Sequence, residues 1–430
     1  MGDTFRIRTN GKPNGLKNAI PRSGTIAALD IGSSKIACII ARAEQGGLRV
    51  LGSALRESRG IRSGTVINID QAEQSIGEAV EAAEELADHR IQEVILSVQC
   101  GHPKSLYAKA EAAGSSVLVS DNHLRMLLAD AKRRCTESGY ETIQAAPTEY
   151  VVDQTRGVSD PRDMVCDRLG VSVHAVAVRS AALQNLRLAV ERRQLTVSRQ
   201  LFAPFASAMA TLTPDEMSLG VTLIDMGAGC TSVCVFREGA LIHADTVPFG
   251  GANITGDIAF VLSTPLSAAE RIKTLYGSAL GQSDAGDDLI DVPLMGEERE
   301  RANNRVRRAH IAKIIRARID DIFGKLRERL EKTGFDVSAG RRAVLTGGAS
   351  QLAGVRDVAS EILNKQVRLG RPQLFPGLAA ANSGPGYATA LGLLISAATT
   401  AAESTDPNPP PVAPPRRAGV AGWLTKHLFE

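Results

Sequence analysis

Two copies of one short pattern, about two hundred residues apart, constrain the fold of this 430-residue chain more than any other feature. Each copy reads as an apolar strand, a turn with Asp and Gly, and a second apolar strand, at residues 28–40 and 223–236. Gly227 and Gly229 of the second turn permit backbone conformations and close approaches that a β-carbon would block. One such turn alone is usually only a hairpin turn. Because the pattern recurs, the sequence predicts two similar halves that each present a phosphate-binding hairpin to a shared cleft.

The turn of the second copy offers groups that suit a polyphosphate. Thr231 can donate a hydroxyl, and Asp225, at the strand end, could hold a metal ion through water. The first turn carries the small hydroxyl residues Ser33 and Ser34 at the matching place. Both turns therefore predict a site for a phosphorylated ligand.

Two further glycine pairs stand where α/β proteins bind ligands. Gly250 and Gly251 precede a predicted helix, whose N-terminus suits an anion. Gly347 and Gly348 follow a strand, at the carboxyl end where such sheets bind ligands. In the predicted helix 267–277, Glu270 and Lys273 lie one turn apart, and the simpler interpretation is a surface ion pair of small value.

The composition is that of a soluble globular protein with two or more domains, 43% hydrophobic and 23% charged. A net charge of +3 implies no global attraction to nucleic acid, and the basic runs at 305–308 and 316–318 fit a solvated helix face. The six scattered cysteines lack metal-ligand spacing and are interpreted as reduced packing residues of a cytosolic protein. We expect neither a membrane span nor a signal peptide.

Residues 99–177 break the strand–helix rhythm and predict an inserted α+β domain. A helix is expected over 121–137, capped by Ser120 or Asp121, among strand-like pieces and a loop at 157–162. Elsewhere, 305–331 predicts one long amphipathic helix. Two small-residue helices, 204–212 and 387–394, favour close helix contact at a hinge.

The chain ends in a Pro-rich linker and a short amphipathic segment, 419–430. A helix there gathers its apolar residues on one face, with Lys426 away from it and Phe429 at its edge; that face holds Val420, Trp423, Leu424 and Leu428. So short a helix needs a partner, and a membrane interface suits its Trp and basic residues. Docking on its own domain or in a protein groove is the alternative.

In chain order, these hairpins, hinge helices, the 267–277 helix and the turn at 346–349 resemble the five nucleotide-binding motifs of the actin superfamily. The chain also resembles the FtsA family of bacterial cell-division proteins closely. This resemblance lies in the insertion, in the sequence Tyr-Gly-Ser-Ala at 276–279, in the sequence Val-Leu-Thr-Gly-Gly-Ala at 344–349, and in the tethered tail. The resemblance covers nearly everything from residue 25 to 398, and the tail.

The resemblance implies an α/β, two-lobed actin-like (ribonuclease H-like) fold, with the insertion in the first lobe and a C-terminal amphipathic helix. The expected boundaries are a disordered tail at 1–22, subdomain IA at 23–98 and 178–215, the inserted subdomain IC at 99–177, subdomain IIA at 216–258, subdomain IIB at 259–340, the rest of IIA with the return to IA at 341–400, the linker at 401–418 and the membrane-targeting helix at 419–430.

The resemblance also implies ATP and Mg²⁺ between the lobes. The residues implied to contact the nucleotide are Asp30, Gly32, Ser33, Ser34, Lys35, Asp225, Gly227, Gly229, Thr231, Gly250, Gly251, Glu270, Lys273, Gly347 and Gly348. Among them, Asp30 and Asp225 would organise the hydrated metal, and Glu270 and Lys273 would lie near the ribose and adenine.

Family membership would further imply filaments, a tail held at the cytoplasmic face of the inner membrane at the septum, and binding of the tubulin-like FtsZ tail through 259–340. Other division proteins are expected at 99–177.

One departure bears on catalysis. Several relatives begin the first hinge helix with Gln or Glu, which positions the attacking water, whereas this chain has Ala203. Because Ala cannot orient or deprotonate water, we expect ATP to act as a conformational ligand with at most slow hydrolysis. Three alternatives are a small-molecule kinase of the same superfamily, a chaperone-like ATPase and a shape-determining MreB-type filament. The first lacks a convincing Asp base and leaves the tail unexplained, the second lacks a substrate-binding β domain, and the third does not use a Pro-linked C-terminal helix.

Overall fold

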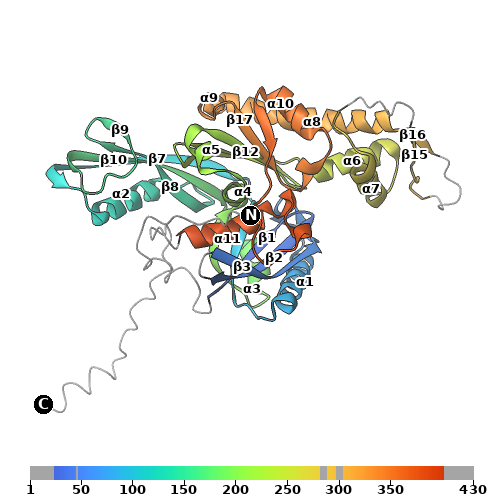
Figure 1. Ribbon diagram of the computed structural model, residues 1–430, viewed down its shortest axis with the longest axis horizontal. Helices are drawn as coiled ribbons and strands as arrows, with labels where there is room; N and C mark the ends of the chain where they lie inside the picture. The colour runs from blue at the N-terminus through green and yellow to red at the C-terminus, as the bar shows by residue number, and fades with distance from the viewer. Residues whose placement is uncertain (1–23, 45–46, 281–287, 297–303, 401–430) are drawn as a thin grey trace, which may run out of the picture.

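A computed structural model describes residues 24–44, 47–280, 288–296 and 304–400. Two lobes stack on one another, and each extends sideways into a smaller subdomain (Figure 1). The insertion, in teal, lies at one end of the long axis, and the α6–α7 region lies at the other. The predicted tails at 1–22 and 401–430 lie outside the described residues.

The first lobe is built on a five-stranded sheet of order β11-β6-β1-β2-β3. Its strands are β1 (Thr25–Ile31), β2 (Lys35–Glu44), β3 (Gly47–Glu57), β6 (Glu93–Val98) and β11 (Thr196–Phe202). The three strands β1, β2 and β3 are antiparallel, whereas β6 and β11 run parallel to β1. Helices α1 (Ile69–Ala87) and α3 (Ser180–Glu191) share the core on one face, and α4 (Ala203–Thr211) and α11 (Ala388–Thr400) share the core on the other. A small hairpin joins β4 (Ile61–Arg62) to β5 (Thr65–Val66).

The second lobe repeats this sheet, in the order β14-β13-β12-β17-β18. Its strands are β12 (Val221–Met226), β13 (Thr231–Arg237), β14 (Ala240–Val247), β17 (Arg342–Thr346) and β18 (Gln366–Leu369). Again the three strands nearest in sequence are antiparallel and the last two run parallel to the first. The predicted pair of similar halves is therefore confirmed.

Helices and a small hairpin complete the second lobe. One sheet face packs on α6 (Gly251–Leu262), α8 (Arg308–Thr333) and α10 (Val355–Leu363). The remaining elements of this lobe are α5 (Pro214–Leu219), α7 (Leu266–Tyr276), α9 (Phe335–Ser338), β15 (Leu289–Asp291), β16 (Arg305–Arg307) and the 3₁₀ turn η2 (Gly348–Gln351). The 3₁₀ turns η3 (Ala380–Asn382) and η4 (Pro385–Tyr387) lie against the first lobe, where Asn382 Nδ2 donates to Ser53 Oγ and Tyr387 lies in the core with α11. The predicted helix over 305–331 was wrong at its start, because Arg305–Arg307 pairs with Leu289–Asp291 as a strand.

The insertion is a four-stranded antiparallel sheet, of order β7-β10-β8-β9, with one helix packed on it. Its elements are β7 (Lys104–Leu118), α2 (Asp121–Arg134), β8 (Tyr140–Val152), β9 (Thr155–Val158) and β10 (Val165–Arg179). The predicted α+β character is confirmed, and Ser120 caps α2 by accepting a hydrogen bond from the His123 N–H. The predicted loop at 157–162 was wrong at its first residues, which lie in β9.

Helices α4 and α11 pack together between the lobes. Ala206 and Ala210 of α4 lie in the core that contains α11 and the first sheet. Ala208, on another side of α4, lies in the core of the second sheet with Val221 and Leu223. The two small-residue helices are thus in contact, as their sequence predicted. Within the described residues, no helix is both long enough and apolar enough to cross a membrane.

Candidate functional site

The two predicted hairpin turns face one another across the lobes. A Cβ on Gly229 would stand 2.6 Å from Ser33 Oγ and 2.8 Å from Ser63 Cα. Ser33 Oγ accepts a hydrogen bond of 2.9 Å from the Gly64 N–H. Any side chain at position 229 would therefore push the lobes apart, which explains the glycine there.

Asp30, near the end of β1, has a hydroxyl partner. Ser97 Oγ donates a 2.7 Å hydrogen bond to Asp30 Oδ1 and accepts one of 3.1 Å from the Ile31 N–H. Desolvation raises the pKa of Asp30 to about 6, against the opposing effects of Ser97 and of the Lys35 charge. The charge of Asp225 also raises it, so the two carboxylates repel each other.

Asp225, on β12, is buried among groups from both hinge helices. Ser207 Oγ of α4 donates a 2.6 Å hydrogen bond to Asp225 Oδ2, and Ser207 Oγ lies 2.9 Å from Thr389 Oγ1 of α11. Desolvation raises the pKa of Asp225, while the Ser207 hydrogen bond and the Lys35 charge lower it. Gly347 has a φ of +87°, and a Cβ there would stand 2.7 Å from the Met226 carbonyl carbon. Only glycine fits that turn.

Lys35 brings a positive charge to the two aspartates. Its ammonium lies 3.9 Å from where a Cβ of Gly348 would be and 5.4 Å from the centre of the Tyr387 ring. Desolvation lowers the pKa of Lys35, and the charges of Asp30 and Asp225 oppose that effect. An ammonium held this way suits an anionic ligand that approaches between the lobes.

The glycine pair before α6 packs against the second hairpin turn. The N–H groups of Gly251 and Ala252 donate to the carbonyls of Gly227 and Ala228, at 3.0 and 2.8 Å, and the Gly250 N–H donates to Asn253 Oδ1 at 2.9 Å. These N–H groups already have protein partners. What Gly250 and Gly251 supply is close packing that fixes the second hairpin turn, rather than free donors at the helix N-terminus.

Lys273 and Glu270 form more than a surface ion pair. Lys273 Nζ lies 2.7 Å from Glu270 Oε2, and it also donates to Thr255 Oγ1 at 2.8 Å and to the Gly251 carbonyl at 3.1 Å. Thr255 Oγ1 in turn donates to Glu270. The pair therefore ties α7 to the first turns of α6, and Glu270 keeps a half-exposed side chain.

The remaining predicted residues lie in the same turns. Thr231 is buried, and its hydroxyl donates to the Phe249 carbonyl at 2.8 Å rather than to open space. Gly32 and Gly227 close their hairpins through N–H bonds to Lys35 and Cys230 carbonyls, at 3.0 and 2.9 Å. Ser34 is exposed. The predicted membrane-binding residues at 419–430 lie outside the described part of the chain.

Sequence reasoning missed Ser97, Ser207 and Thr389. Each is a small hydroxyl residue in an otherwise apolar or small-residue element, and each gains its partner only through the tertiary fold. Only in β6 is the hydroxyl alone, since α4 also holds Thr211 and α11 also holds Ser396, so no local signal singled out Ser207 or Thr389.

The carboxylates suit a hydrated divalent ion. Oxygen ligands and retained water are what Mg²⁺ prefers, and a cation would relieve the repulsion between Asp30 and Asp225. Across the described residues, no group of three or more His, Cys, Asp or Glu side chains could hold an ion on its own. A metal at these two aspartates would therefore take its other ligands from water and from a bound phosphate.

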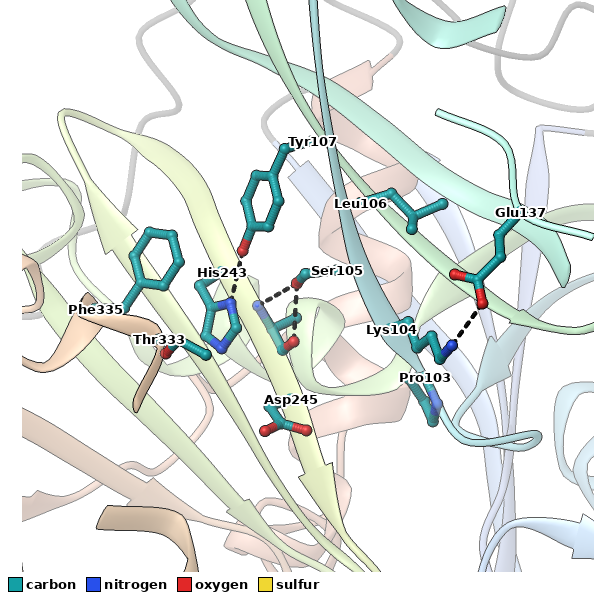
Figure 2. Close-up of a pocket in the computed structure, with 11 residues that line it drawn as sticks. Pro103, Lys104, Ser105, Leu106, Tyr107, Glu137, His243, Asp245, Thr333 and Phe335 are labelled. Carbon is teal, nitrogen blue, oxygen red and sulfur yellow. Dashed lines mark hydrogen bonds and ion pairs between the residues drawn. The ribbon is translucent and has the colours of Figure 1, made fainter. Parts of the chain in front are cut away.

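A separate surface pocket of about 390 Å³ lies between the insertion and the second lobe. Figure 2 shows its lining side chains, among which Tyr107 points to His243 and Lys104 points to Glu137. The Tyr107 hydroxyl lies 2.7 Å from His243 Nδ1, and Ser105 Oγ donates to the Ala244 carbonyl at 2.8 Å and accepts from its N–H at 2.9 Å. These polar groups pair the insertion with the second lobe, so the pocket lies where these two parts of the molecule are attached to each other. None of the predicted site residues lines it.

The six cysteines are free and buried, as the sequence predicted. Burial raises the pKa of the Cys230 thiol to about 12, so this residue next to the second turn is unreactive.

Comparison with known proteins identifies relatives over most of the chain. The family model described as "Cell division protein FtsA" matches residues 222–392, and the one described as "SHS2 domain inserted in FTSA" matches residues 100–177. The cell division protein FtsA of Rhizobium meliloti (strain 1021) is 39% identical over 385 residues, covering 87% of this chain and 87% of that protein. Its counterpart in Escherichia coli (strain K12) is 30% identical over 377 residues, covering 86% and 89%.

Two solved structures share the fold. A PilM-PilN type IV pilus biogenesis complex gives a TM-score of 0.61 at 18% identity, covering 88% of this chain and 99% of the other. MreB5 of Spiroplasma citri bound to ADP gives 0.55 at 11% identity, covering 89% and 99%. At such identities the likeness shows the fold alone. The expected actin-like α/β fold with an inserted domain is confirmed.

Proposed function

We propose that this chain, which belongs to the FtsA family of cell division proteins, binds ATP between its lobes and tethers the FtsZ ring to the cytoplasmic membrane. It is a division protein of the actin-like family.

One observation carries the ATP proposal: the glycine turns of both lobes converge on Lys35 and two aspartates. Gly229 reaches Ser33 across the lobes, while Gly348 lies beside the Lys35 ammonium. Backbone and ammonium groups of this kind suit a polyphosphate. The structural neighbour MreB5 is described as bound to ADP, which adds support for a nucleotide in this fold.

Asp30 and Asp225 are the residues that would hold Mg²⁺ through water. When bound, the ion would neutralise charge on the phosphates. The hydroxyls of Ser97 and Ser207 keep the two carboxylates oriented toward that role. Glu270 and Lys273, braced by Thr255, would lie near the ribose and adenine.

We assign ATP the role of a conformational ligand with at most slow hydrolysis. Ala203 begins α4, is buried, and has no group to orient a water. The nearest hydroxyl on the same helix, Ser207, already donates to Asp225. General-base help from this helix is therefore not expected.

Three surfaces would serve the partners. The outer part of the second lobe, within 259–340, would bind the FtsZ tail, and it exposes the apolar side chains of Phe260, Val261 and Leu266. The insertion, 99–177, would meet other division proteins, and copies of the chain would assemble into filaments. The tail, 419–430, would lie on anionic lipid at the cytoplasmic face of the inner membrane at the septum.

Sedimentation with anionic liposomes tests the tether. The full-length protein should pellet with lipid, and a chain stopped at Glu403 should not, each with and without ATP. Trp423→Glu should abolish pelleting because it places a charge on the apolar face, whereas the control Thr425→Glu, on the other face, should retain most of it. If the truncated chain pellets like the full-length protein, or neither pellets, the tether is wrong, and a small-molecule kinase becomes the better explanation of an ATP site.

A further inference from the structure

The chain crosses between the lobes twice, and both crossings run past Asp225. The first crossing leaves α4 for β12, and the second returns from β18 to α11. Asp225 stands near the end of β12 in the second lobe. Helix α11 packs on the first sheet, with Leu391 and Leu394 in that core.

Each crossing helix brings one hydroxyl to this carboxylate. Ser207 Oγ of α4 donates to Asp225 Oδ2 at 2.6 Å, and Thr389 Oγ1 of α11 lies 2.9 Å from Ser207 Oγ. Because Ser207 gives its one hydroxyl proton to Asp225, Thr389 donates to Ser207, and Thr389 also lowers the pKa of Asp225. The link therefore joins a second-lobe strand to a helix that packs on the first lobe.

The helices that carry these hydroxyls are locked together. A Cβ on Gly392 of α11 would overlap the Ala206 carbonyl of α4 and stand 3.1 Å from Ala206 Cα. Two helices in such close contact cannot slide past each other without losing this packing. A displacement of Asp225 is thus met by both helices as a unit.

We propose that Ser207 and Thr389 are positioning residues that couple occupation of the metal–phosphate site at Asp225 to the angle between the two lobes. This inference rests on the proposed ATP function and adds its regulation. Asp225 is one of the two carboxylates that would hold a hydrated cation, and a cation bound there would attract this carboxylate and change the pull on its hydroxyl partners. The directional hydroxyl bonds then either break or bring α4 and α11 along, and α11 carries the first lobe with it.

The test measures the interlobe distance in the full chain by pulsed electron paramagnetic resonance. Spin labels go on Glu85→Cys of α1 and Arg271→Cys of α7, two exposed positions in different lobes. The native cysteines are buried, so the labels report only the introduced sites. Each protein is measured without nucleotide and with Mg-ATP, and ATP affinity is measured separately with a fluorescent ATP analogue.

Loss of both hydroxyls should reduce the ATP-dependent change in interlobe distance much more than it reduces ATP binding. The double variant Ser207→Ala, Thr389→Val should bind ATP about fivefold more weakly and lose most of the ATP-dependent distance shift. Thr211→Val is the matched control, because its buried hydroxyl lies on the same helix but donates to the Ser207 carbonyl. That control should shift as the wild type does. Thr389→Ser, which keeps a hydroxyl, should restore the shift that Thr389→Val alone diminishes, and it serves if the double variant does not fold.

The outcomes distinguish the two proposals. If the double variant binds ATP and shifts like the wild type, the coupling is wrong and ATP binding stands. A wild type that binds ATP with no change in distance refutes the coupling in the same way. If the wild type binds no ATP at all, both proposals fail.

Discussion

Gly392→Ala tests the packing of the crossing helices by adding one methyl group. Position 392 lies inside α11, where the new Cβ would overlap the Ala206 carbonyl oxygen of α4. Because that contact is with backbone and not with a flexible side chain, the helices must separate. We expect the substitution to destabilise the protein even though alanine is the better helix former.

The magnitude follows from two opposing terms. Overpacking a close-packed core costs roughly 1–3 kcal/mol, and the upper end applies where backbone must move. Alanine in place of glycine within a helix contributes about 1 kcal/mol in the favourable direction. The free energy of unfolding should therefore fall by about 2 kcal/mol.

Gly324→Ala supplies the matched control. Gly324 lies inside α8, is exposed, and a Cβ there would meet nothing within 4 Å. The same chemical change should then raise the free energy of unfolding by about 1 kcal/mol. Urea unfolding followed by circular dichroism compares the two. Equal shifts of the same sign in both variants would refute the packing argument.

Three further predictions concern charged groups. Burial lowers the pKa of His174 to about 3, so between pH 6.5 and 5 the unfolded chain binds a proton at this residue and the folded chain does not. The free energy of unfolding should therefore fall by about 2 kcal/mol over that range. In His174→Gln the free energy of unfolding should depend less on pH, and a pH dependence equal to that of the wild type would contradict the prediction. Arg368→Met should lower the free energy of unfolding in urea by about 2 kcal/mol, because it leaves the buried Glu216 carboxylate without its ion-pair partner. The double variant with Glu216→Gln should recover part of that free energy, and no recovery would count against the ion pair. Lys35→Met should weaken ATP about tenfold or more in a fluorescent ATP titration without destabilising the nucleotide-free protein, since its ammonium is desolvated there; unchanged affinity would remove Lys35 from the proposed site.

The hairpin turns were predictable because their signal is local. An apolar run, Asp, Gly and a second apolar run specify strand, turn and strand within about a dozen residues, at both 28–40 and 223–236. The duplication then predicted that the halves would share one topology, as they do. Helix α1 was likewise predictable from its apolar spacing.

Other features depended on contacts that no local pattern encodes. Strand β7 contains several Ala, Lys and Glu residues, which favour helices. It is nevertheless a strand, because it pairs with β10 along nearly its whole length. Ser207 and Thr389 are 182 residues apart in sequence, so their meeting at Asp225 follows from the way the lobes stack. The paired N–H groups before α6 also emerge only when the second hairpin turn lies against them.

Ser105 attaches the base of the insertion to the second lobe, and the rest of the insertion projects outward from that contact. Both ends of the insertion are covalently part of the first lobe, yet Ser105 holds the N–H and carbonyl of Ala244 in β14 as a neighbouring strand would. Strand β7 continues outward from Ser105 to Leu118, 13 residues further on, which is about 43 Å at 3.3 Å each. A tilt of about 5° at this contact would move the far tip by about 4 Å, close to the spacing between paired strands. A change between the lobes that is too small to break any core contact would thus become a displacement of several ångström at the tip of the insertion.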